Sequence, residues 1–201
     1  MRAAESPSRR IERTLHRLYA RVAQRPSSAS LFQCIGKLEL ERGFAYPSVR
    51  FSAHCAADVA FRCSLELAPN DVWTILYFAS LHHARGWHED AIALCGRAHE
   101  LAPPLDLPLI HMGDAFASLR KYGDADRCYR QAVEIDPNSE VAKARLEKWL
   151  KFWIPERERR RRHAGRCWAC GYDLRDDQSN DVETLALTCP NCGKTQPPTK
   201  R

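Results

Sequence analysis

The segments AIALCGRAHELAP (Ala91–Pro103) and ADRCYRQAVEIDP (Ala125–Pro137) match each other at fixed positions and decide the fold of this chain. Ala91, Ala98 and Pro103 of the first segment correspond to Ala125, Ala132 and Pro137 of the second. Ala57, Phe61 and Pro69 precede the first segment by the same interval of about 34 residues. Small residues seven apart lie on one face of a helix, where they allow a second helix to approach closely. The pattern therefore predicts an all-α protein built from repeated pairs of helices.

A period of about 34 residues with these small, aromatic and proline positions resembles the tetratricopeptide repeat (TPR), a helix–turn–helix unit that stacks into a solenoid. The resemblance divides the chain into two well-matched units, Val72–Leu105 and Asp106–Ser139, and a degenerate unit, Leu31–Asp71. The degenerate unit carries about nine extra residues between its two helices. Gly113 stands where the family has a glycine, and we expect it to permit close packing of two helices.

Amphipathic segments flank the repeats. The first, roughly Ser8 to Gln24, is expected to be a helix whose apolar face packs on the repeats. Its opposite face carries five arginines, Arg9, Arg10, Arg13, Arg17 and Arg21. That basic face is either a solvated surface or a contact with nucleic acid or a membrane surface. The last, Ser139 to Trp153, is expected to cap the open end of the solenoid, although its tryptophans beside lysines would also suit a membrane surface.

The resemblance also implies a surface for partners, because the inner face of the first helices binds peptides in this family. By register this groove would be lined by Gln33, Lys37, Trp73, Leu76, Ser80, His83, Leu107, Ile110 and Asp114. Some members clamp the terminal carboxylates of a chaperone with Lys and Asn here, whereas these positions are mostly apolar in this chain. An apolar helix or extended segment of a partner is therefore the expected ligand. The chain's own N-terminal helix is the alternative occupant.

Four of the nine cysteines form two C-x-x-C pairs, Cys167 with Cys170 and Cys189 with Cys192. Residues 171–188 lie between the two pairs. This spacing is typical of a four-thiolate zinc site, in which each pair presents two ligands from one tight turn. The strings CWACGYDLR and CPNCG resemble those of short bacterial zinc ribbons. The resemblance implies a small β zinc ribbon holding one structural Zn²⁺. Thiol redox chemistry is the rival interpretation, but it requires a βαβ unit that the surrounding sequence does not predict.

The other five cysteines lie on predicted helices of the repeats and are expected to pack as small apolar residues: Cys34, Cys55, Cys63, Cys95 and Cys128. A dense basic run joins the repeats to the predicted ribbon, and it comprises Arg157, Arg159, Arg160, Arg161, Arg162 and Arg166. This run is either a solvated helical linker or a phosphate-binding surface.

Five regions follow from these patterns. We expect an N-terminal helix and loop (1–30), a TPR-like domain with its capping helix (31–154), a basic linker (155–166), the zinc ribbon (167–195) and a disordered tail (196–201). The linker boundary is placed at Pro155 because proline interrupts helices.

Composition and charge limit the function. Hydrophobic residues make up 44% and charged residues 28% of the 201, which disfavours a disordered chain and a multi-span membrane protein. Residues 1–24 carry charges throughout and resemble no secretory signal, so a cytoplasmic protein is expected. No catalytic motif is present. The sequence thus predicts a non-enzymatic protein–protein interaction adaptor, with a nucleic-acid-binding accessory protein as the alternative.

Overall fold

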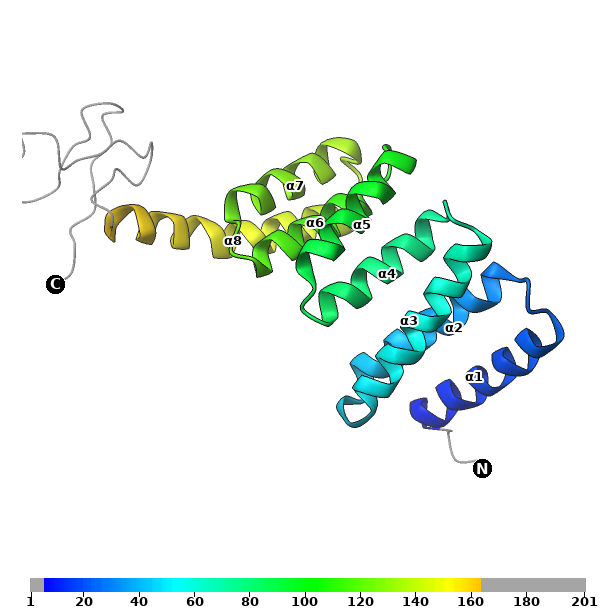
Figure 1. Cartoon of the computed structure of the whole chain (residues 1–201). Coiled ribbons are helices and arrows are strands. Elements are labelled where there is room, and N and C mark those ends of the chain that lie inside the picture. Colours follow the sequence, from blue (N-terminus) through cyan, green and yellow to red (C-terminus); the bar gives the residue numbers. More distant parts are fainter. Residues whose placement is uncertain (1–5, 164–201) are drawn as a thin grey trace, which may run out of the picture. The chain divides into compact units, whose positions relative to one another are not determined.

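The computed structural model describes residues 6–163, with side chains described as far as residue 152. This part of the chain is helical, which confirms the predicted all-α fold, whereas the predicted ribbon and tail lie outside it (Figure 1). The helices are α1 (Pro7–Gln24), α2 (Ala29–Ala45), the short 3-10 helix η1 (Pro47–Val49), α3 (Arg50–Leu67), α4 (Val72–Ala84), α5 (His88–Leu101), α6 (Leu107–Ser118), α7 (Tyr122–Ile135) and α8 (Glu140–His163). The chain divides into two compact units, residues 1–143 and 144–201.

The first unit consists of helix pairs packed in sequence. α2 packs on α3, α4 on α5 and α6 on α7, and each pair contacts the next through α3–α4 and α5–α6 (Figure 1). Each pair falls within one unit of the sequence repeat. The extra residues of the first repeat lengthen α2 to 17 residues, compared with 13 in α4 and 12 in α6, and add η1 before α3.

Small residues make the close contacts that the repeat pattern predicts. Ala91, Ala98, Ala125 and Ala132 are at most 1% exposed. Gly113 lies against the Tyr129 ring, and a Cβ atom there would be 2.7 Å from the tyrosine Cε1. The aromatic side chain thus occupies the space that the glycine leaves between α6 and α7.

Apolar clusters join neighbouring helices into one core. Leu15 and Leu18 of α1 pack with Leu31 and Ile35 of α2, so α1 covers the first repeat. Fully buried Phe61 of α3 packs with helix α4 in the next cluster. The apolar face expected of the N-terminal helix is therefore largely buried, with the exception of Tyr19, which is 47% exposed.

The start of α8 belongs to the first unit. Ser139 caps it, because the Ala142 N–H donates a hydrogen bond to Ser139 Oγ at 3.2 Å. Ala142 is 1% exposed and packs with Leu109, Ile110 and Ala132. The helix continues through Pro155, where we expected the linker to begin, as far as His163. Over residues 6–163, no helix combines the length and the apolar composition of a membrane span.

Candidate functional site

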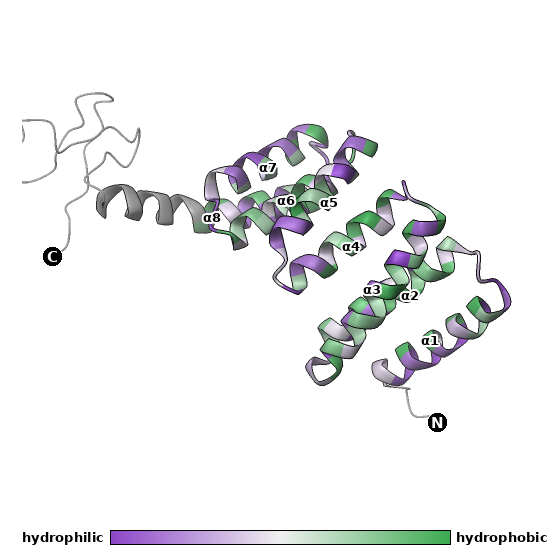
Figure 2. Cartoon of the chain, viewed as in Figure 1, coloured by the Kyte–Doolittle hydropathy of each residue, from purple (hydrophilic) through white to green (hydrophobic). Residues whose placement is uncertain are grey.

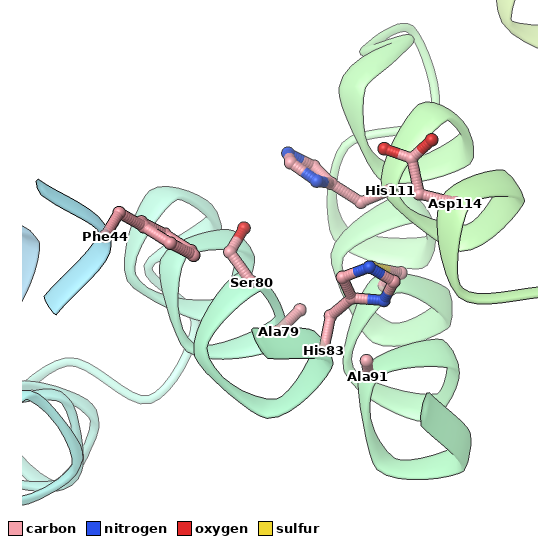
Figure 3. A pocket seen from close by; sticks show the side chains of 8 residues that line it. Phe44, Ala79, Ser80, His83, Ala91, His111 and Asp114 are labelled. Carbon is pink, nitrogen blue, oxygen red and sulfur yellow. The ribbon is translucent and has the colours of Figure 1, made fainter. Parts of the chain in front are cut away.

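The first helices of the three repeats enclose a pocket of about 220 Å³ together with α5. It is lined by Phe44 of α2, Ala79, Ser80 and His83 of α4, Ala91 and Cys95 of α5, and His111 and Asp114 of α6 (Figure 3). Each repeat supplies residues to it, so the pocket exists only in the stacked form of the chain.

The floor of the pocket is apolar. Ala79, Ala91 and Cys95 are at most 1% exposed and present only methyl groups and a thiol. Phe44 is 56% exposed and reaches from the end of α2 toward Ser80 (Figure 3). An apolar floor with an aromatic side suits an apolar group of a ligand.

The rim of the pocket is polar and its groups are held in place. Tyr129 Oη donates a hydrogen bond to Asp114 Oδ1 at 2.6 Å, which fixes the only acidic side chain of the rim. His83 and His88 bring their Nδ1 atoms within 3.2 Å of each other. Ser80 Oγ donates to the Leu76 carbonyl of its own helix at 3.0 Å. The rim thus combines one carboxylate with imidazole and hydroxyl groups.

Three of the groove residues expected from sequence, Ser80, His83 and Asp114, line this pocket. Leu76 and Ile110 do not, because they are 3% and 2% exposed and belong to the core between the repeats. The expectation that Leu76 and Ile110 form part of an exposed apolar surface is therefore wrong.

Other expected groove residues lie outside the pocket. Trp73 is 48% exposed at the start of α4, and Leu107 is half-buried beside the core cluster of α4. Gln33 Nε2 donates to Asp71 Oδ2 at 2.6 Å and to Thr74 Oγ1 at 3.0 Å, while Lys37 Nζ lies 5.5 Å from the centre of the Tyr77 ring. Gln33 and Lys37 therefore join the first repeat to the second.

Phe44 and His111 were missed by the sequence analysis. Phe44 lies in the extra turn of α2, outside the repeat register, so the repeat gave no position for it. His111 follows a register position by one residue and reaches the pocket from α6 (Figure 3). The one signal in the sequence for Phe44 was the insertion in the first repeat, because its extra residues could be interpreted as a longer first helix.

The N-terminal helix does not occupy the pocket. Among the described helices α1 packs on α2, and none of its residues lines the pocket. The N-terminal helix is therefore not the occupant of this pocket.

Burial changes the acid–base behaviour of two cysteines. Cys95 and Cys128 are buried, and burial raises the pKa of their thiols to about 12 and about 11, with the neighbouring Cys128 and Asp114 adding to the effect at Cys95. Cys34 is exposed, and Cys55 and Cys63 are half-buried. Full burial in the repeats is thus confirmed for two of the five cysteines.

Metal binding by the repeats finds no support in the described side chains, because these contain no group of three or more His, Cys, Asp or Glu that could hold a metal ion. The predicted zinc ligands Cys167, Cys170, Cys189 and Cys192 lie outside the described residues, as does Arg166. Arg157 and Arg159–Arg162 lie on the last turns of α8.

Known proteins with similar chains and folds share this helical architecture. The chain is 31% identical over 91 residues to the small glutamine-rich tetratricopeptide repeat-containing protein 2 of Mycosarcoma maydis; the match covers 45% of this chain and 26% of that protein. The structure resembles the TPR protein TTC0263 of Thermus thermophilus, with a TM-score of 0.65 and 14% identity over 71% of this chain and 74% of the other. The helical repeats have the tetratricopeptide-repeat fold.

Two further solved structures agree with this fold. MamA of Desulfovibrio magneticus RS-1 gives a TM-score of 0.57 at 15% identity, over 70% of this chain and 75% of that one. The Sgt2 TPR domain of Aspergillus fumigatus gives 0.50 at 23% identity, over 62% and 82%. No family model matches the chain.

Proposed function

We propose that the repeats form a non-enzymatic interaction module that holds a segment of a partner protein in the pocket between α2, α4 and α6. The observation that carries this proposal is a pocket with an apolar floor and a polar rim to which all three repeats contribute. Protein-recognition sites combine an apolar anchor position with surrounding polar groups in this way.

The size of the pocket limits its ligand. Pockets for small molecules measure roughly 300–1,000 Å³, whereas this one measures about 220 Å³. It suits one apolar side chain of an extended or helical segment better than a cofactor. Asp114 at the rim favours a segment in which this apolar residue has a lysine or arginine beside it, because Asp114 is the only acidic residue that lines the pocket and no lysine or arginine lines it.

The test begins with peptides selected on the full chain from a random display library. Their affinities are then measured for the wild-type protein and for Ser80→Trp, in which the indole would fill the pocket. Ser52→Trp is the matched control, because Ser52 is exposed on α3 and does not line the pocket. We expect Ser80→Trp to weaken binding at least tenfold and Ser52→Trp to leave it unchanged, with both variants retaining the wild-type circular dichroism spectrum.

Salt distinguishes this function from nucleic-acid binding. Affinity in an apolar pocket changes little between about 50 and 200 mM salt, whereas contacts with phosphates weaken steeply. If Ser80→Trp binds the selected peptides as tightly as the wild type does, the pocket is not the partner site.

We also infer that Cys167, Cys170, Cys189 and Cys192 hold one structural Zn²⁺ that gives the partner a second rigid contact. The support is the paired C-x-x-C spacing, which is typical of four-thiolate zinc sites. Metal analysis of the purified chain should give one zinc per chain, lost in Cys170→Ser and retained in Cys95→Ser. Zinc retained in Cys170→Ser would contradict this assignment.

A further inference from the structure

The outer face of α1 is a line of arginines. Arg9, Arg13, Arg17 and Arg21 follow one another at intervals of four residues and Arg10 lies beside them; all five are exposed. Residues four apart in a helix are separated by about 6 Å along its axis, so Arg9 to Arg21 extends over about 18 Å. Glu12 is the only acidic residue in α1.

This line has a rigid support. Leu15 and Leu18 on the other side of α1 are 4% and 9% exposed and pack against α2. Ser6 caps the helix by accepting a hydrogen bond from the Arg9 N–H at 3.4 Å, and Pro7 occupies its first turn. Figure 2 shows apolar (green) and polar (purple) positions together along α1, as expected of a helix with one buried face. The arginines therefore keep a fixed spacing without any need for a partner to order the helix.

The chemistry of the face selects among anionic partners. Every basic residue in α1 apart from His16 is an arginine, and the planar guanidinium matches phosphate with two parallel hydrogen bonds. Between the arginines the same face carries only His16, Ala20 and Gln24. Insertion into a membrane needs aliphatic side chains, and the large ones of α1 pack in the cluster that includes Leu31 and Ile35 of α2: Ile11, Leu15, Leu18 and Val22. Arginine clusters also bind acidic peptides, but the other side chains of this face, His16, Ala20 and Gln24, offer such a peptide no large apolar contact.

We propose that the arginine face of α1 binds the phosphate backbone of double-stranded nucleic acid. A duplex carries one negative charge for about every 1.7 Å of its axis, so it offers dense charge to this band of cations, which turns gradually around α1 from Arg9 to Arg21. The one aromatic residue of α1 among Phe, Tyr and Trp is Tyr19, which lies on another side of the helix and donates a hydrogen bond to Glu39 Oε1 at 3.3 Å. The arginine face itself therefore offers no Phe, Tyr or Trp ring to stack on unpaired bases, which favours a duplex over a single strand. The contact is to the backbone and is independent of base sequence. It is separate from the pocket between α2, α4 and α6.

The experiment measures binding of the full chain to fluorescent 20-base-pair DNA and RNA duplexes by anisotropy between about 50 and 200 mM salt. Five phosphate contacts give a slope of log affinity against log salt of about −4.5, or a loss of about 500-fold over this range. The variant Arg9→Gln/Arg13→Gln/Arg17→Gln/Arg21→Gln should reduce the steepness of the slope by about 3.6. Glutamine has nearly the helix propensity of arginine, so α1 should persist, as circular dichroism would verify.

The matched control removes four arginines from the second basic run, Arg159→Gln/Arg160→Gln/Arg161→Gln/Arg162→Gln. We expect this control to retain duplex binding with a slope of about −4.5. Vesicles containing phosphatidylserine form a third arm. The proposal is overturned if the α1 variant binds duplexes as the wild type does, if the control loses all binding, or if the wild type binds the vesicles and neither duplex.

Discussion

The ring of Tyr129 in α7 lies directly over Gly113 in α6, so that a Cβ atom at position 113 would be 2.7 Å from the tyrosine Cε1. The ring cannot move aside freely, because Tyr129 Oη donates to Asp114 Oδ1 at 2.6 Å. This contact joins the packing of the last repeat to the rim of the pocket. A side chain at position 113 would therefore force the Tyr129 ring or the two helices to shift.

Gly113→Ala should therefore destabilise the repeats. Overpacking costs about 1–3 kcal/mol, and the better helix propensity of alanine offsets about 1 kcal/mol of it. We expect a net loss of about 1 kcal/mol in the free energy of unfolding, measured with urea. Gly96→Ala is the control, since a Cβ atom there would meet only Met112 Cε at 4.0 Å. It should be stabilising by up to about 1 kcal/mol, and equal effects of the two substitutions would contradict this explanation.

The turn between α4 and α5 and the turn between α6 and α7 each contain one residue in the left-handed conformation, but the residue type differs. Gly86 has φ +84° and Arg120, at the equivalent position of the next repeat, has φ +59°. A residue with a Cβ atom is strained in this left-handed region by about 1 kcal/mol. Gly86→Ala should destabilise by about 1 kcal/mol, although a Cβ atom there has nothing within 4 Å, and Arg120→Gly should stabilise by about 0.5 kcal/mol. Chemical denaturation of both variants checks the signs, which must be opposite.

His82 should make stability depend on pH. Its side chain lies between the rings of Phe78 and Trp87, at centroid distances of 4.5 and 5.2 Å. Burial lowers the pKa of His82, and Asp90, whose Oδ2 is 3.6 Å from Nδ1, acts against this effect. Because the folded pKa is below the unfolded value of about 6.5, the unfolded chain takes up the proton first. Stability is thus complete above about pH 6.5 and declines as pH falls through the folded pKa.

The test compares the wild type with His82→Phe in urea unfolding between pH 7.5 and 5.5. One such histidine contributes at most about 1.4 kcal/mol per pH unit, and the difference between the two proteins isolates this contribution from that of His54, whose pKa burial also lowers. His16→Gln is the control, because His16 is exposed on α1. A pH dependence that is identical in the wild type and His82→Phe would rule out His82 as its source.

Thiol reactivity should follow burial. Cys34 is exposed, whereas Cys95 and Cys128 are 0% and 6% exposed and have thiol pKa values raised by burial to about 12 and about 11. Since the thiolate is the reactive form, iodoacetamide at pH 8 should modify Cys34 in the folded protein. Cys95 and Cys128 should react only after denaturation. Mass spectrometry of digested peptides measures each site, and modification of Cys95 at the rate of Cys34 would show that the core opens readily.

Side-chain spacing was sufficient to predict the repeat. The repeat period follows from the self-similarity of the chain, and the paired alanines share a face because positions seven apart in a helix do. The expectation for Gly113 came from the resemblance to the tetratricopeptide repeat. The same reasoning identified the buried face of α1, because its apolar residues recur at helical spacing. These features depend on neighbours along the chain, which is why the sequence alone determined them.

The pocket depended on contacts between helices that the sequence does not specify. Register placed Leu76 and Ser80 on the same face of α4, yet Leu76 is 3% exposed in the core and Ser80 lines the pocket. Phe44 reaches the pocket because the insertion extends α2 by an additional turn instead of forming a loop. Helical periodicity fixes the direction of a side chain, but its burial depends on how neighbouring helices are spaced and rotated. Those spacings are known only from the folded chain, because they result from the packing of the whole set of side chains between the helices.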